Sequence, residues 1–230
     1  RRLYHRYVHA FPASYREAVT PAEAVGDIDR LEALSAKSAE SGTVAFHVFR
    51  RAGDAHHELR LKLYYVGGVA ELSSSMPVFE NMGLTVAEEL NHRVRAPGET
   101  GFGVTIHDYR MRLQRERPLD IDEVQTKLAD AMAAAFAGTI ENDGFNRLTL
   151  DAGLAHGQVT ILRAVAKFLR QTGIQNSIRD LVANLIWMSR GYAFYCISCG
   201  LIHSAILIII LSRTAWQKLL VLKKGHLGLC

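Results

Sequence analysis

Cysteine is absent from the first 174 residues of this 230-residue chain, and its three cysteines, Cys196, Cys199 and Cys230, lie near the end. This absence excludes a disulfide framework in the body of the protein and favours a reducing compartment. Residues 1–16 also lack the apolar core of a signal peptide. We therefore expect a cytoplasmic protein.

Acidic residues are nearly missing from residues 175–230, which hold six basic residues and one acid, Asp180. The preceding 174 residues hold 21 basic and 22 acidic residues, so the formal net charge of +4 comes from the end of the chain. The body offers no basic surface of the kind that binds nucleic acid. Nucleic acid is therefore not an expected partner.

Charged residues are missing altogether from residues 191–212, a run of 22 residues. That length is enough for a membrane-spanning helix, and Arg213 and Lys218 follow it as a positive flank. Three interpretations stay open: out-of-frame translation, a genuine membrane anchor, and a buried apolar helix. We expect the first, a frameshifted or truncated end, because amphipathic period and charge balance fail together at about Gln175.

Two groups of residues resemble metal ligands. Cys196 and Cys199 form a C-x-x-C pair with His203 nearby, and His56 and His57 are adjacent in an expected turn. A structural zinc site needs four ligands, and a redox pair needs a βαβ setting that this sequence does not predict. We therefore assign no metal-binding residue.

A helix is predicted over residues 21–36. Thr20 is a suitable N-cap, Pro21 suits the first helical position, and Glu23 completes a capping box. The apolar stripe consists of Ala24, Ile28, Leu31 and Leu34. The acids between these positions, together with Arg30, indicate a solvated face, so we expect a linker or docking helix.

Residues 43–50 and 57–66 are predicted strands joined by a turn. The second alternates apolar with polar side chains: Leu59, Leu61 and Leu63 against Arg60, Lys62 and Tyr64. Side chains on a strand point to alternate faces, so one face is expected to be buried and the other exposed to water.

A helix over residues 72–82 and strands over 84–95 and 102–113 complete the order β-β-α-β-β. Ser73 or Ser74 is expected to cap this helix and Gly83 to end it. Four short strands with an intervening helix predict an α+β fold with helices on one sheet face. His107 and Asp108 lie in the last strand and point to opposite faces, so we expect packing roles and not a catalytic pair.

Helical spacing continues over residues 120–136 and about 158–171. The apolar face of the second helix is expected to hold Ile161, Leu162, Val165 and Leu169. Between the helices lies a polar group: Glu141, Asn142, Asp143 and Asn146. We interpret this group as a loop whose side chains cap neighbouring helix ends.

Five blocks of the chain resemble, in order, the large bacterial NAD-specific glutamate dehydrogenases. The blocks are residues 11–17, 24–32, 61–64 with 77–84, 106–108, and 141–148 with 162–171. The resemblance covers about residues 3–174. It implies a helical linker over residues 1–40, an ACT-like (ferredoxin-like) domain over 41–116 and a helical entry to the catalytic region over 117–174. Residues 175–230 remain as an atypical apolar helical tail.

This resemblance implies the oxidative deamination of L-glutamate to 2-oxoglutarate and ammonia, with hydride transfer to NAD, in a homo-oligomer. Such chemistry needs an activating lysine, a carboxylate for proton transfer and a glycine-rich turn for the dinucleotide phosphates. Gly98, Gly101 and Gly103 lack the required strand-then-helix setting. We therefore assign no catalytic and no cofactor-binding residue, and expect this segment to be inactive by itself.

The alternative function is that of a regulatory module. The resemblance implies that the ACT-like sheet binds an amino-acid effector near the loop of Gly67 and Gly68, although the sequence does not identify the contacting residues. Such a module would be free, or tethered to a membrane through residues 191–212.

Overall fold

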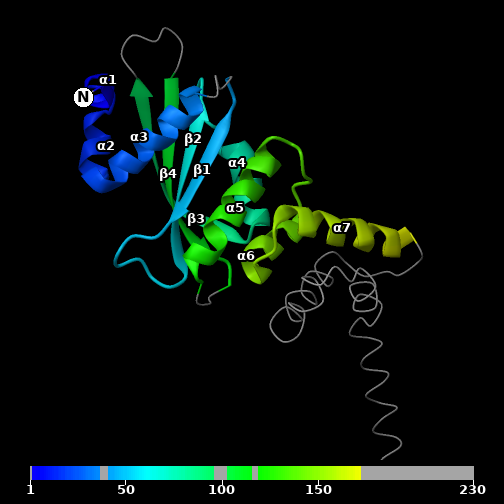
Figure 1. Cartoon of the computed structure of the whole chain (residues 1–230). Helices are drawn as coiled ribbons and strands as arrows, with labels where there is room; N and C mark the ends of the chain where they lie inside the picture. Colours follow the sequence, from blue (N-terminus) through cyan, green and yellow to red (C-terminus); the bar gives the residue numbers. More distant parts are fainter. Residues whose placement is uncertain (1, 37–40, 96–102, 116–118, 172–230) are drawn as a thin grey trace, which may run out of the picture. The chain divides into compact units, whose positions relative to one another are not determined.

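The computed structural model describes residues 2–36, 41–95, 103–115 and 119–171 (Figure 1). The chain divides into two compact units, with the boundary between Asn142 and Asp143. The predicted span over residues 191–212 and the group of Cys196, Cys199 and His203 lie outside the described residues. Across the described ranges, no helix combines the length and the apolar character needed to cross a membrane.

The first unit contains nine helices and strands within its described residues. They are α1 (Arg2–Tyr7), α2 (Ala13–Ala18), α3 (Pro21–Ala36), β1 (Val44–Phe49), β2 (Glu58–Val66), α4 (Leu72–Asn81), β3 (Leu84–Arg95), β4 (Gly103–Leu113) and α5 (Ile121–Phe136). The predicted order β-β-α-β-β is confirmed, as is the α+β class. The short helices α1 and α2 were not predicted, because neither is long enough to show an apolar period.

The four strands form one antiparallel sheet in the order β1-β2-β4-β3. The register places Leu61 of β2 between Val48 of β1 and Tyr109 of β4. With α5, the element order is ββαββα, which is the ferredoxin-like order βαββαβ begun one strand-helix pair later. An ACT-like sheet is therefore a fitting description of this unit.

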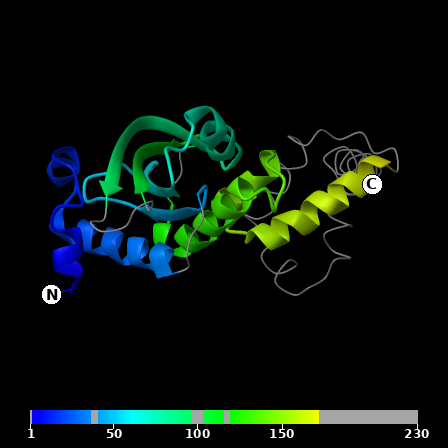
Figure 2. The same cartoon turned by 90° about the horizontal axis from the view of Figure 1, so that it is seen from above.

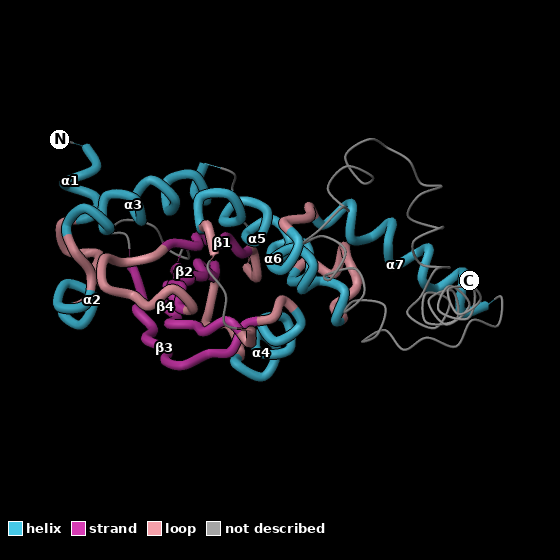
Figure 3. Tube along the Cα trace, turned by 90° about the horizontal axis from the view of Figure 1, so that it is seen from below, coloured by secondary structure: helices cyan, strands magenta, loops and turns pink. Residues whose placement is uncertain are grey.

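Helices cover both faces of the sheet, whereas the sequence predicted one covered face. Helices α4 and α5 pack on the face that carries Phe46, Leu61 and Tyr109, where Phe79 contacts Tyr109 and Phe136 contacts Phe46. Helix α3 packs on the opposite face, and Figures 2 and 3 show its course alongside the sheet. The segment predicted as a linker or docking helix is thus docked on the sheet as a structural layer of the first unit.

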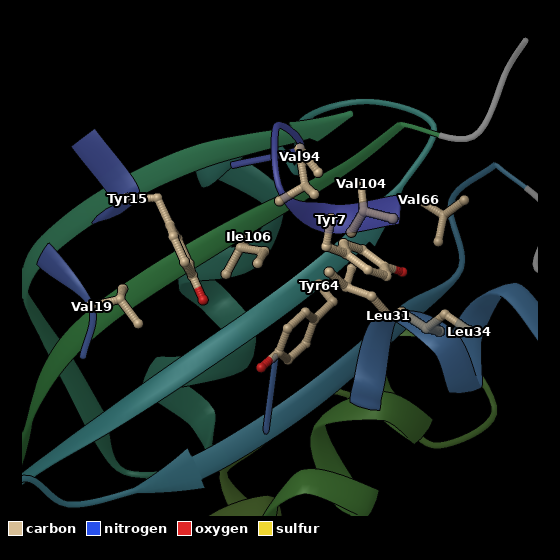
Figure 4. Packing of buried hydrophobic residues seen from close by; sticks show 11 residues of the cluster. Tyr7, Tyr15, Val19, Leu31, Leu34, Tyr64, Val66, Val94, Val104 and Ile106 are labelled. Atoms are coloured by element: carbon tan, nitrogen blue, oxygen red, sulfur yellow. The ribbon is translucent and has the colours of Figure 1, made fainter. Parts of the chain in front are cut away.

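The core under α3 combines aliphatic and tyrosine side chains. Leu31 and Leu34 of α3 meet Tyr64 and Val66 of β2 and Ile106 of β4, all of them buried (Figure 4). Further members come from α1 to β4: Tyr7, Ala10, Tyr15, Val19, Val94 and Val104. The strand face that carries Tyr64 is therefore closed to water, contrary to the prediction from its alternating pattern.

The helix ends follow the predicted chemistry in part. Thr20 Oγ1 accepts a hydrogen bond from the backbone N–H of Glu23 at 3.3 Å, as an N-cap should. The Glu23 carboxylate does not complete the capping box, because it binds Arg51. Helix α4 begins after Glu71 without a side-chain cap, so neither Ser73 nor Ser74 is the cap.

The second unit contains a 3-10 helix, η1 (Gly144–Arg147), and helices α6 (Leu148–Ala152) and α7 (His156–Gln171). Helix α6 ends at Gly153, whose φ of 65° suits a residue without a Cβ atom. Helix α7 buries Val159, Leu162 and Ala166. Ile161, predicted to lie on the apolar face, is 54% exposed. The side chain of Leu169 lies outside the described residues.

Candidate functional site

A buried ionic cluster joins α3 to the sheet, with the carboxylate of Asp27 at its centre. Lys62 Nζ lies 2.5 Å from Asp27 Oδ2, and Tyr15 donates its hydroxyl to the same oxygen at 2.5 Å. Tyr64 donates to Oδ1 at 2.6 Å. Asp27 and Lys62 are each 1% exposed. One carboxylate thus accepts three hydrogen bonds, one from α2 and two from alternate residues of β2.

A second group of charges extends the cluster toward the β1–β2 turn. Arg51 binds Glu23 through two nitrogens, at 2.8 and 2.7 Å, in the paired geometry that suits guanidinium and carboxylate. The same side chain reaches Asp108 Oδ2 of β4 at 3.2 Å. Glu23 Oε2 also lies 3.7 Å from Lys62 Nζ, so the two groups are electrostatically continuous.

The charges of the cluster shift the pKa values of its members. Burial, together with the hydrogen bond to the Asp27 carboxylate, raises the pKa of Tyr15 far above 10. Burial and the charge of Asp27 do the same to the pKa of Tyr64. Burial would raise the pKa of Glu23, but the hydrogen bonds and charge of Arg51 outweigh it and lower that pKa. Both tyrosines therefore stay protonated donors.

Asp108, an acid of the second group of charges, has fewer hydrogen bonds than its two carboxylate oxygens can accept. Its side chain is 4% exposed, and its Oδ1 atom has no hydrogen-bond partner among the described residues. Burial raises the pKa of this carboxyl, and the charges of Arg51 and Lys62 offset part of the effect. An unpaired buried oxygen costs stability.

The contacts of this cluster are those of a structural ion pair and not of a reactive site. Each polar atom of Asp27 and Lys62 faces a partner from the protein, and apolar rings enclose them: Lys62 Nζ lies 5.8 Å from the ring centre of Tyr15 and 5.6 Å from that of Phe49. A catalytic acid or base must be reachable by the proton that it transfers. Asp27 is enclosed, so its role is to fix α3 on the sheet.

The cluster was not predicted from the sequence, because the acids of residues 21–36 were interpreted as a solvated face and Lys62 as a residue exposed to water. Both interpretations are wrong for the residues of the cluster, since Asp27 and Lys62 are buried, whereas Asp29 of the same helix is exposed as predicted. A signal was present: Asp27 is three residues after Ala24 and four before Leu31, which places it on the apolar stripe of α3. An acid on a buried stripe needs a buried cation, and Lys62 is that cation.

The loop that the sequence singled out for an effector is bound closely to β4. Gly67 donates its N–H to the carbonyl of Gly103, and Thr105 Oγ1 donates to the carbonyl of Gly68 at 2.5 Å. The N–H of Ala70 donates to His107 Nε2 at 3.2 Å. These main-chain groups are therefore engaged within the protein and do not form an open cradle for a ligand.

Neither strand-to-helix connection of the first unit fits the phosphates of NAD. Of the two strand-to-helix connections in the first unit, the one from β4 to α5 contains no glycine, and the one from β2 to α4 contains Gly67 and Gly68. The latter ends in Glu71, the N-cap residue of α4. A carboxylate at this position opposes the anion binding that a helix N-terminus otherwise offers.

Three histidines considered in the sequence analysis, His56, His57 and His107, lie within the described residues. His107 and Asp108 point to opposite faces as predicted: His107 Nδ1 lies 2.8 Å from Glu89 Oε1, while Asp108 binds Arg51. His56 and His57 lie in the β1–β2 turn. Within the described ranges, no group of three or more histidine, cysteine or acidic side chains is arranged to hold a metal ion.

The polar group of residues 141–146 organises the start of the second unit. Asp143 Oδ1 accepts from the N–H of Phe145 at 3.0 Å, which confirms the predicted capping role. Arg163 of α7 binds Asp143 at 2.8 and 3.0 Å and donates to Asn146 Oδ1 at 2.7 Å. Arg163 and Asn146 are 3% and 1% exposed. This network fixes η1 against α7.

Comparisons with known proteins identify three family segments in sequence order. Residues 1–34 match the family model "Glutamate dehydrogenase, helical motif 2", residues 43–124 match "Glutamate dehydrogenase, ACT3 domain", and residues 140–187 match "Glutamate dehydrogenase, helical motif 3". The last match continues twelve residues beyond Gln175, the point at which the sequence analysis placed the departure from the family pattern.

Similar curated proteins have the name NAD-specific glutamate dehydrogenase. Identity is 35% over 161 residues with the protein from Pseudomonas aeruginosa, 32% over 169 residues with that from Halomonas elongata, and 34% over 176 residues with that from Mycobacterium tuberculosis. These alignments cover 70%, 74% and 74% of this chain and 10% of each relative, so the chain spans about a tenth of their length. With three family segments in order and these identities, the chain belongs to the family of the large NAD-specific glutamate dehydrogenases.

Proposed function

We propose that this chain is the part of an NAD-dependent glutamate dehydrogenase that positions the catalytic region without taking part in the reaction. The whole enzyme would convert L-glutamate and NAD to 2-oxoglutarate, ammonia and NADH. The observation that carries this proposal is the order of the three family segments, an ACT3 domain between two helical motifs. Each of these names belongs to glutamate dehydrogenase.

The non-catalytic role is supported by the pairing of the buried charged side chains within the described residues. The buried lysine and acid of the first unit, Lys62 and Asp27, neutralise each other inside the fold. The buried arginine of the second unit, Arg163, is bound to Asp143 and Asn146. Neither group leaves a cation free to polarise a substrate carbonyl, and the β2–α4 turn does not fit NAD phosphates.

The test is an assay of the purified 230-residue chain with L-glutamate and NAD. We expect no NADH absorbance above that of a heat-denatured sample, and no heat of NAD binding in calorimetry. Glutamate-dependent NADH formation that disappears on denaturation would contradict the proposal. A matched assay of an intact family enzyme under the same conditions controls for the buffer and substrates.

The proposal also covers the partners, the compartment and the domain division of the protein. L-glutamate and NAD would be partners of the whole enzyme, in a homo-oligomer that works in the cytoplasm. The lack of cysteine in residues 1–174 suits that reducing compartment. We keep residues 1–40, 41–116, 117–174 and 175–230 as the proposed domain division.

A second candidate function is that of an amino-acid-binding regulatory module, which the match to an ACT3 domain favours. Calorimetry of the chain with each common amino acid tests it. A saturable heat for one amino acid would support this function, whereas no heat across the set would count against it. The hydrogen bonds that join the Gly67–Gly68 loop to β4 count against this loop as the effector's contact.

Membrane tethering through residues 191–212 is tested separately. Membranes from cells that express the chain would be washed with alkaline carbonate, which removes peripheral proteins. Retention in the membrane pellet would support an anchor, and release into the supernatant would contradict it. The charge-free sequence of this segment is the observation that motivates the experiment.

A further inference from the structure

An apolar groove of about 440 Å³ lies among helices α1, α2 and α3, and it shares Tyr15 with the ionic cluster. Its floor includes the buried rings of Tyr7 and Tyr15. Phe11 lies between them in a stacked row, with ring centres 6.0 Å from Tyr7 and 4.4 Å from Tyr15. A floor of this kind is rigid and offers a large apolar contact area.

The rim of the groove exposes four large apolar side chains. Leu3 is 41% exposed, Tyr4 68%, Val8 37% and Val25 61%. Scattered exposed apolar residues are ordinary on a protein surface, but four around one groove form a patch. A small molecule in the groove would leave most of these rim side chains in water. An occupant that covers them must therefore be a protein surface.

Two opposite charges complete the rim, Arg16 of α2 and Asp29 of α3. Both side chains are exposed, and within the described ranges neither makes an ion pair. A wholly acidic partner would satisfy Arg16 and repel Asp29, and a wholly basic partner would do the reverse. A surface that carries both charges beside one apolar groove is complementary to itself.

We propose that this groove is the interface between two copies of this chain, related by a two-fold axis. Such an interface uses the same patch twice, so that a contact between residues i and j occurs in both directions. Arg16 of each copy would pair with Asp29 of the other. Tyr4, the most exposed ring of the rim, would enter the groove of the other copy, in keeping with the enrichment of tyrosine and arginine at interface centres.

The first experiment measures the mass of the 230-residue chain by light scattering and sedimentation over a range of concentrations. We expect an exchange between monomer and dimer. The Val25→Glu variant should abolish the dimer, because it places a carboxylate on the apolar rim that the other copy would cover. The Leu90→Glu variant is the matched control, since Leu90 is a 44% exposed apolar residue on β3, outside the groove.

The second experiment is a charge exchange that tests the two-fold arrangement. Arg16→Asp alone should weaken the dimer by about 100-fold, because it sets like charges against each other twice. The double variant Arg16→Asp with Asp29→Arg should recover most of the loss. A chain that is monomeric at every concentration would overturn the proposal. So would an association that survives Val25→Glu, or a double variant that stays as weak as the single one.

Discussion

Asp27 in α3 and Lys62 in β2 lie 2.5 Å apart, and each is 1% exposed. This ion pair connects a helix of the motif over residues 1–34 to a strand of the ACT3 domain. A buried pair of this kind contributes little net stability compared with apolar packing, but its geometry is specific, because any other register of α3 would leave two charges buried and unpaired. The pair therefore sets the position of α3 on the sheet.

Lys62→Met should destabilise the first unit by about 3 to 5 kcal/mol, because Asp27 would keep a buried charge without its cation. Urea denaturation followed by circular dichroism measures the loss. Arg93→Met, an exposed substitution on β3, is the control and should change the unfolding free energy by less than about 0.5 kcal/mol.

A double-mutant cycle measured by the same urea denaturation tests whether Asp27 and Lys62 interact. Asp27→Asn combined with Lys62→Met should cost less than the sum of the two single variants, since each single change leaves the other group unpaired. Additive costs would show that the two side chains do not interact and would contradict the account.

Tyr15→Phe and Tyr64→Phe should each lower the unfolding free energy by about 1.5 to 3 kcal/mol, the range for hydrogen bonds to a charged group. Each variant removes one hydroxyl donor from the Asp27 carboxylate while the ring stays in place. Tyr65→Phe, on the neighbouring position of β2, is the matched control. If it cost as much as the other two, the effect would lie in the ring environment and not in the cluster.

High pH should unfold the first unit through these same tyrosines. Burial and the charge of Asp27 raise the pKa values of both tyrosines. The native state therefore keeps the hydroxyl protons that the unfolded chain releases near the ordinary tyrosine pKa of 10.0. Stability is present in full below pH 10 and falls above it, by about 1.4 kcal/mol per pH unit for each tyrosine. Unfolding midpoints measured from pH 8 upward should therefore fall less steeply in the double phenylalanine variant; an unchanged slope would refute this explanation.

His47 should make the protein sensitive to acid. Burial, followed by the positive charge of Arg30, lowers the pKa of His47 to about 4 from 6.5. A depressed pKa gives stability that is present above pH 6.5 and is lost as the pH falls toward 4. His47→Phe should flatten the dependence of the melting temperature on pH in that window. Nuclear magnetic resonance of the ring protons would locate the pKa directly, and a value near 6.5 would contradict the expectation.

Gly67→Ala should destabilise the loop between β2 and α4 more than Gly53→Ala destabilises the β1–β2 turn. Both glycines have positive φ, 84° and 97°, so alanine strains the backbone at each by about 1 to 2 kcal/mol. At Gly67 the added Cβ atom would also lie 2.3 Å from Ser41 Oγ, whereas at Gly53 no atom lies within 4 Å. Thermal melts compare the two; equal losses would mean that the contact with Ser41 has no effect.

Local periodicity predicted the strands and the longer helices from residue 21 to residue 171, because it depends only on neighbouring residues. The short helices η1 and α6 were not predicted, since neither is long enough to show a period. The burial of Lys62 could not be predicted in this way. A strand that alternates apolar and polar residues has the same pattern whether water or a charged helix covers its polar face. The partner of that face, Asp27, lies 35 residues earlier, and only its place on an apolar helical stripe signalled it.

Local sequence rules also predicted only part of the network around Asp143. Asp143 was predicted as a cap, since capping acts over two residues, but its second partner, Arg163, is twenty residues away. The apolar face of α7 was predicted to include Ile161 and Leu162. The sequence of the helix alone does not show whether the side of Ile161 or the side of Arg163 is buried. The structure buries Arg163 and exposes Ile161, because Asp143 and Asn146 supply the guanidinium with acceptors.

Helix α3 and the sheet should open as one cooperative unit, because the Asp27 cluster joins them. Native-state hydrogen exchange of the full chain would compare the slowest amides of α3 with those of β2. We expect the same opening free energy for both, within about 1 kcal/mol, since neither can open without breaking the buried pair. Amides of α3 that exchange almost without protection, beside protected amides in β2, would contradict the account and return residues 21–36 to the role of a linker.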